Sequence, residues 1–295
     1  MSDIKITLFD LNLGAFAPTA TTLVEKIDNA MGGLFLPWQK CRIAKADAKI
    51  ALMQTETKIK ISGLERRALS RFVKEEAKKQ ENIEEITRLA LPQVEEGARP
   101  QDVDDDWIMN FFEKCRIISN ENMQRLWAKV LAGEANNPGA FSKRTIGLLS
   151  EMSQNDALIF CNLCSFCLDV CGTALFIYPP YKIVYYDNGI NESSTKHLHS
   201  LGLIHYDLWG GARKDGLPQK FEIKYFDRRI GISFLDNSDH TLDLGVATLT
   251  QAGLELFSLC PTSSIDGFID IVIRNLLVQQ QRRQEQGRKF DVLVL

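Results

Sequence analysis

The hydrophobic period of this chain changes at Gly172, and that change constrains the fold more than any other sequence feature. Before Gly172, apolar residues recur at helical spacing, as in Trp107, Ile108, Phe111, Phe112, Cys115 and Ile118. After it, β-forming residues alternate with polar ones, most clearly over 221–225 and 230–234. A chain of 295 residues exceeds the usual size of one domain, so we expect two packed units with extensions. The predicted fold class is mainly α with a smaller α+β part: a helical bundle followed by a winged-helix-like domain.

Strong helix formers fill the segment between Pro37 and Pro92, and each proline would begin or end a helix. Ser62-Gly63-Leu64-Glu65 matches a capping box, and Asn82 offers a further helix start. We therefore expect three helices rather than one, over 38–61, 63–80 and 82–91.

Charge is sorted along this same region. From Lys40 to Lys79 there are twelve Lys and Arg against five Asp and Glu, whereas Glu81 to Asp106 holds nine acids and two arginines. The two blocks would either pair, within the protein or between subunits, or remain a solvated basic helix followed by an acidic linker.

Capping residues and glycines divide the rest of the first half into helices. One is expected from Asn120 to Gly133, a short one after the cap Ser142, and a longer one from Ser153 through Val170. The predicted domain organisation begins with an N-terminal segment (1–37), a long basic helical arm (38–96) and a helical bundle core (97–172). A winged-helix-like α+β domain (173–260) and a C-terminal amphipathic helix with a basic tail (261–295) follow.

The second half is expected to alternate strands with short helices. Strands are predicted over 175–178 and 183–186, a helix over 194–201, a hairpin from 221 to 234, a helix capped by Thr250, and an amphipathic helix from Ile265 into the polar tract Gln279–Lys289. The run of helix, Leu201-Gly-Leu-Ile, hairpin and helix is typical of winged-helix domains. In such a domain the residues for contacting nucleic acid would be basic: Lys196, Arg213, Lys214 and Lys220.

Four cysteines have the C-x2-C-x2-C-x3-C spacing of ferredoxins, whose thiolates bind an iron–sulfur cluster: Cys161, Cys164, Cys167 and Cys171. The ferredoxin run ends in proline, whereas Gly172 follows here. The intervening residues also predict a helix, which would make the cysteines one buried stripe of small hydrophobes. We therefore expect no cofactor at this run.

Other candidate sites have weaker patterns. His197, His199 and His205 lack a second ligand pair with zinc spacing. Asp215 with Glu222-Ile-Lys224 resembles a metal-dependent nuclease hairpin, but any exposed strand carries such residues. There is no Walker loop, Gly-x-Gly-x-x-Gly or Gly-x-Ser-x-Gly motif. A non-enzymatic protein is favoured, with no catalytic or metal-binding residue and no small-molecule substrate nominated.

A cytoplasmic location is expected. The start of the chain lacks the pattern of a secretory signal, and its seven cysteines suit a reducing compartment. The Gly32–Trp38 element and the basic residues after it are the candidate contact with a membrane surface or a partner: Leu34, Phe35, Trp38, Lys40 and Arg42. Peripheral membrane association is thus an alternative.

Three blocks resemble an uncharacterised bacterial family of domains of unknown function: Asp105-Asp106-Trp107, Ile118 to Glu134 and Asn137 to Thr145. Members of that family place a basic helix upstream, as in Arg66-Arg67-Ala68-Leu69, and a segment like Gln80-Glu81-Asn82. The resemblance covers residues 35 to 170 best.

More distantly, the chain is similar to the Abi-alpha abortive-infection family. The shared features are a Leu-Pro element before a long helix, a Pro-x-Phe turn with one extra residue here, and a helix start at Met152 to Ala157. This resemblance implies a sensor or effector of bacterial phage defence that acts through protein or membrane-surface contacts, with a protein partner or self-association. The alternatives are a winged-helix DNA-binding regulator and, third, a metal-dependent nuclease or iron–sulfur protein.

Overall fold

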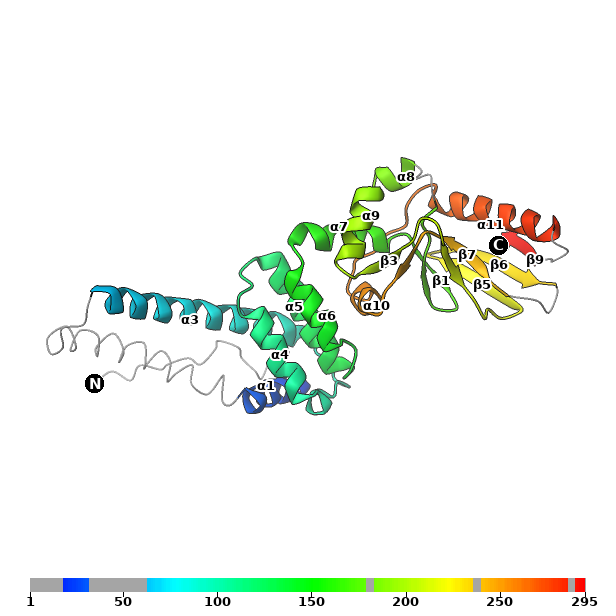
Figure 1. Ribbon diagram of the computed structural model, residues 1–295. Helices are drawn as coiled ribbons and strands as arrows, with labels where there is room; N and C mark the ends of the chain where they lie inside the picture. The colour runs from blue at the N-terminus through cyan, green and yellow to red at the C-terminus, as the bar shows by residue number, and fades with distance from the viewer. Residues whose placement is uncertain (1–17, 32–62, 179–182, 236–239, 286–289, 295) are drawn as a thin grey trace. The chain divides into compact units, whose positions relative to one another are not determined.

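The computed structural model describes residues 18–31, 63–178, 183–235, 240–285 and 290–294 (Figure 1). They form two compact units, one up to Ser150 and the other from Glu151. The division falls inside the 97–172 segment that we assigned to one helical bundle. The first unit is helical and the second mixes helices with antiparallel sheet, so the protein is mainly α with a smaller α+β part.

The first unit packs its helices around an aromatic centre. Its elements are α1 (Pro18–Ala30), α3 (Gly63–Ala90), α4 (Asp105–Cys115), α5 (Glu121–Asn136), α6 (Lys143–Glu151) and the 3-10 turns η2 (Leu91–Gln93) and η3 (Pro100–Asp102). Phe111 of α4 lies at the centre, with its ring centroid about 5 Å from those of Trp107, Phe112 and Trp127. These fully or nearly buried rings supply much of the hydrophobic stabilisation of the unit.

A buried glutamate organises the turn after α5. Glu134 accepts hydrogen bonds from the backbone N–H groups of Gly139 (2.7 Å) and Phe141 (2.9 Å). The indole of Trp107 donates to the carbonyl oxygen of Phe141 at 2.6 Å. The turn is therefore tied to both α4 and α5.

The second unit contains a five-stranded antiparallel sheet in the order β2-β1-β5-β6-β9. These strands are Cys167–Val170 (β1), Thr173–Leu175 (β2), Lys220–Tyr225 (β5), Arg228–Phe234 (β6) and Phe290–Val294 (β9). Helix α11 (Phe268–Glu285) lies against the sheet (Figure 1), and Phe268 packs on Tyr225 and Phe166.

Among the described residues, two small strand pairs and four helices complete this unit. The strands β3 (Ile204–Tyr206) and β8 (Ala247–Leu249) form one antiparallel pair, and β4 (Ala212–Lys214) and β7 (Leu242–Gly245) form the other. The helices are α7 (Gln154–Cys164), α8 (Ile183–Tyr186), α9 (Glu192–Ser200) and α10 (Gln251–Phe257). The hairpin over 221–234 and the helix capped by Thr250 are confirmed.

Several predicted boundaries are wrong. The helices expected over 63–80 and 82–91 are one helix, α3, because the Asn82 side chain bonds across to the loop after α4 instead of capping its own backbone. Helix α5 continues past Gly133 to Asn136. The helix expected over 38–61 lies outside the described residues.

The predictions around the sheet need three corrections. The helix expected through Val170 ends at Cys164, because Cys167–Val170 pairs as a strand with both β2 and β5. Residues 183–186 form a helical turn rather than a strand, and this turn packs Tyr185 against both Phe166 and Phe268. The C-terminal helix begins at Phe268, after Ile265, and its polar tract is followed by β9, which had not been foreseen.

Candidate functional site

Helix α3 carries the candidate site, because its two halves differ in burial. Residues from Gly63 to Arg71 are all exposed, whereas Asn82, Ile83, Glu84 and Ile86 are buried against the rest of the first unit. The exposed half includes large apolar side chains: Leu64 is 68% exposed, Phe72 59% and Leu69 41%. Exposed apolar side chains gathered on one element are typical of an interaction surface.

Four basic residues of α3 share one side of the helix. Arg67, Arg71, Lys74 and Lys78 are separated by four, three and four residues, so they lie one above another on a 3.6-residue helix. We name these four residues the basic strip. Leu64 flanks the strip, about 60° round the helix from Arg67. Phe72 lies further round, about 100° from Arg71, and Glu75, which pairs with Arg71 at 3.3 Å, lies between them.

A groove of about 620 Å³ opens where α3 becomes buried. Lys78, the last residue of the basic strip, lines it together with Glu85 and Arg88 of α3. From the other side it is lined by Ser119 of the loop before α5 and by Arg125 of α5. The strip and the groove therefore form one continuous surface along α3.

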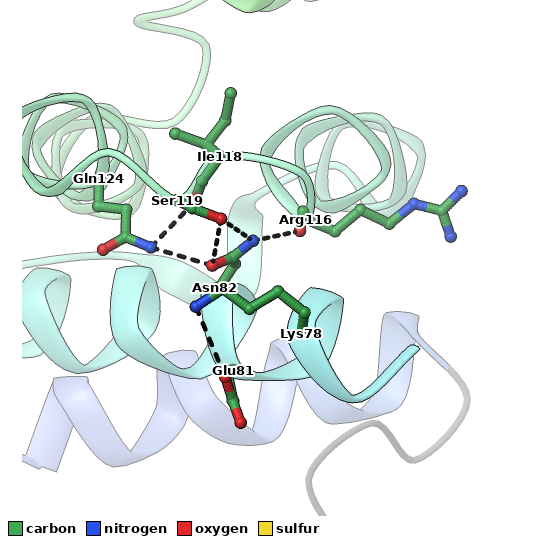
Figure 2. A network of polar contacts seen from close by, with 7 residues as sticks. All are labelled: Lys78, Glu81, Asn82, Arg116, Ile118, Ser119 and Gln124. Carbon is green, nitrogen blue, oxygen red and sulfur yellow. Dashed lines mark hydrogen bonds and ion pairs between the residues drawn. The ribbon is translucent and has the colours of Figure 1, made fainter. Parts of the chain in front are cut away.

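The wall of the groove is held by a network centred on Asn82 (Figure 2). The Asn82 amide nitrogen donates to the Arg116 carbonyl oxygen (2.8 Å) and to Ser119 Oγ (3.2 Å). Gln124 Nε2 donates to Asn82 Oδ1 (3.3 Å) and to the Ile118 carbonyl oxygen (2.9 Å). Since Asn82 and Gln124 are both buried, this network fixes α3 against the start of α5.

Charges within the groove are mixed. Arg88 donates two hydrogen bonds to Glu85, at 2.8 and 2.6 Å, and this pairing lowers the pKa of Glu85 and raises that of Arg88. Lys78 Nζ lies 3.6 Å from Glu81 (Figure 2). The groove therefore presents both signs of charge.

The residues proposed from sequence for membrane or partner contact lie outside the described residues: Leu34, Phe35, Trp38, Lys40 and Arg42. Among the described residues, none of the helices combines the length and apolar character needed to cross a bilayer.

The proposed nucleic-acid contacts lie on three elements of the second unit. Lys196 is exposed on α9 and pairs with Glu192 at 2.6 Å, which raises its pKa. Arg213 is exposed on β4, and Lys214 beside it is half-buried, its Nζ 3.5 Å from the Gly172 carbonyl oxygen. Lys220 begins β5 and is exposed.

The cysteine run does not form the expected helical stripe. Cys161 and Cys164 lie on α7, Cys167 lies on β1, and Cys171 is exposed in a turn with a φ of 52°. A cysteine from outside the run, Cys260, lies with its Sγ 3.1 Å from that of Cys161 and is also hydrogen-bonded to Cys164. In the described part of the chain, no three His, Cys, Asp or Glu side chains gather as ligands for a metal ion.

The histidines and the nuclease-like residues have separate partners. His197 Nε2 lies 2.7 Å from Asp156 Oδ1, and His199 Nδ1 lies 3.1 Å from the Ile204 carbonyl oxygen. Glu222 pairs with Arg229 across the β5–β6 hairpin at 3.1 Å.

The described residues thus define a mainly helical protein with a smaller α+β part, in which one half of α3 exposes both apolar and basic side chains. The chain belongs to the family described as protein of unknown function, DUF2806, whose model matches residues 66–273. That match runs from the exposed half of α3 into α11 and so spans both units. No curated protein and no solved structure matches the chain.

Sequence reasoning found the basic half of α3 but missed the groove. The available signal was the pair of blocks that carried the family resemblance, Gln80-Glu81-Asn82 and Ile118 to Glu134. Residues of these two blocks meet in the Asn82 network, although 42 positions separate Asn82 from Gln124.

Proposed function

We propose that this protein is a non-enzymatic effector or sensor of bacterial phage defence that binds an acidic protein partner through the exposed half of α3. The observation that carries the contact surface is that the basic strip and the exposed apolar side chains Leu64 and Phe72 share the exposed half of α3. Apolar anchors next to positive charge suit a partner whose interface mixes apolar and acidic side chains. The phage-defence role rests on the distant similarity to the Abi-alpha family.

The test is phage plating on cells that express the protein at a matched level. The variant Arg67→Glu/Arg71→Glu/Lys74→Glu reverses three charges of the strip. The control Arg144→Glu/Lys224→Glu/Arg228→Glu reverses three other exposed charges. We expect the wild type and the control to lower plating efficiency and the strip variant to lose protection, because like charges would then face the partner.

Each part of the proposal has its own contrary result. Wild-type protein that gives no protection against a broad phage panel would remove the phage-defence role. A strip variant that protects as well as the wild type would show that the exposed half of α3 is not the contact surface. Binding of the wild type, but not of the strip variant, to anionic vesicles would show that this surface binds a membrane instead of a protein partner.

A second candidate is a winged-helix DNA-binding regulator. Helix α9 is followed by β3, which pairs with β8, and α10 follows directly, an order consistent with the helix and wing arrangement. Binding of duplex DNA that weakens steeply with salt, and whose salt dependence falls in Arg213→Ala/Lys214→Ala/Lys220→Ala, would support it. Fluorescence anisotropy over a salt series provides that measurement.

A further inference from the structure

Two cysteines that are far apart in the sequence meet in the second unit. The Sγ atoms of Cys161, on α7, and Cys260, just after α10, lie 3.1 Å apart, although the residues are 99 positions apart. A disulfide bond is about 2.05 Å long, so roughly 1 Å of movement would bring the two sulfurs to bonding distance. Cys260 also lies within 3.6 Å of the Leu256 carbonyl oxygen, at the end of α10.

These two thiols combine proximity with access to solvent. Cys161 and Cys260 are both half-buried, whereas Cys115, Cys164 and Cys167 are buried. Burial raises the pKa of each of those three buried thiols, which keeps them protonated and unreactive. Cys171 is exposed but lies in the turn after β1, and Cys41 lies outside the described residues.

We propose that Cys161 and Cys260 form a redox-active pair, which a hydroperoxide oxidises to a disulfide and a dithiol reduces again. One thiolate attacks the peroxide oxygen, the O–O bond breaks, and a sulfenic acid forms with release of water or an alcohol. The other thiol then attacks the sulfenic sulfur, the S–O bond breaks, and water leaves. The two thiols lose two electrons and two protons in total, and the peroxide gains them.

The disulfide would join elements that already surround α9. Helix α7 reaches α9 through the contact between Asp156 and His197 at 2.7 Å. Thr250, at the start of α10, donates to the Gly202 carbonyl oxygen just beyond α9 at 2.7 Å. Oxidation therefore adds a covalent connection to a hydrogen-bonded cluster and restrains α7 relative to α10. This inference is independent of the α3 surface.

The experiment uses the full-length chain, reduced, freed of reductant and then exposed to hydrogen peroxide. Remaining thiols are blocked with N-ethylmaleimide and the digest is examined by mass spectrometry. We expect a cross-linked pair of peptides holding Cys161 and Cys260, lighter by two hydrogen atoms and reversed by dithiothreitol. The link should persist in Cys164→Ser, whose side chain also contacts Cys260, and in Cys171→Ser, and it should disappear in Cys161→Ser and Cys260→Ser.

The wild-type protein gives the first contrary result even if Cys260→Ser folds poorly. The proposal is overturned if peroxide oxidises Cys171 while Cys161 and Cys260 both remain reduced and react with N-ethylmaleimide. It is also overturned if the purified reduced protein holds a stoichiometric metal that Cys260→Ser loses, because the thiols would then be ligands.

Discussion

Asn82 shows how one side chain fixes the surface along α3. Its amide and carbonyl groups are both hydrogen-bonded while the residue is only 2% exposed. Removing it leaves the Arg116 carbonyl oxygen and the Gln124 amide without this partner in a buried position. The wall of the groove therefore depends on the side-chain amide.

We predict that Asn82→Ala lowers the free energy of unfolding of the first unit by about 1–3 kcal/mol, the usual cost of unsatisfied buried polar groups. Asn122→Ala, at an exposed position of α5, should change it by less than about 0.5 kcal/mol. Urea denaturation followed by tryptophan fluorescence measures both. Equal effects of the two substitutions would contradict the structural role given to the network.

Asp156 makes the stability of the second unit depend on pH. Burial raises the pKa of its carboxyl group, but hydrogen bonds from the Ser153 backbone and from His197 outweigh this, and the net shift is downward. A carboxyl group whose pKa is lower in the folded state stabilises the fold at pH values above its pKa in the unfolded state, about 3.9. This stabilisation is lost as the pH falls through the pKa of the folded state.

We therefore predict that Asp156→Asn destabilises the protein at pH 7. The difference in the free energy of unfolding between the variant and the wild type should shrink as the pH falls towards and below the pKa of Asp156 in the folded protein. Urea midpoints measured from pH 7 down to pH 3 provide the comparison. Asp215→Asn, at an exposed turn, is the matched control and should show no such convergence. A difference that stays constant with pH would exclude a contribution from the Asp156 charge.

At the scale of elements, two helical glycines differ in the space around them. A Cβ atom added at Gly253 of α10 would lie 2.1 Å from the Leu203 carbonyl oxygen, whereas one added at Gly147 of α6 meets nothing within 4 Å. The close approach at Gly253 lets α10 pack on the chain that enters β3.

Gly253→Ala should therefore destabilise the second unit by about 1–3 kcal/mol, because the backbone of 203 must move. Gly147→Ala should stabilise the first unit by roughly 0.5–1 kcal/mol, since alanine loses less backbone entropy in a helix. Thermal unfolding by circular dichroism distinguishes the two. A stabilising Gly253→Ala would mean that α10 does not approach Leu203 so closely.

At the scale of the molecule, each unit has its own aromatic core. Phe111 packs with Trp107, Phe112 and Trp127 in the first unit, and Phe268 packs with Phe166 and Tyr225 in the second. Both phenylalanines are fully buried. The two cores are therefore matched sites for comparing the units.

We expect Phe111→Ala and Phe268→Ala each to cost about 3–5 kcal/mol in the unit that contains it. Hydrogen exchange monitored by mass spectrometry should show faster exchange mainly in 63–150 for the first and mainly in 151–285 for the second. Faster exchange throughout the chain in both variants would show that the two units unfold together.

The sequence by itself determined the features that depend on local periodicity and capping. The α4 stripe, the capped helices after Ser142 and Thr250, and the hairpin over 221–234 all follow from spacing and turn residues within a few positions. The exposed basic half of α3 was also evident, because its charges are neighbours in sequence as well as in space.

The tertiary structure alone decided the features that depend on long-range partners. Asn82 has the residue type of a helix cap, but its side chain donates hydrogen bonds to the loop at 116–119, and α3 continues. Cys167–Val170 follows a helical pattern, but pairing with β2 and β5 makes it a strand. Cys260 lies far from the cysteine run in the sequence, and only the fold of the second unit brings it to Cys161. In the first two cases a contact between distant residues outweighs a local preference worth at most about 1 kcal/mol per residue.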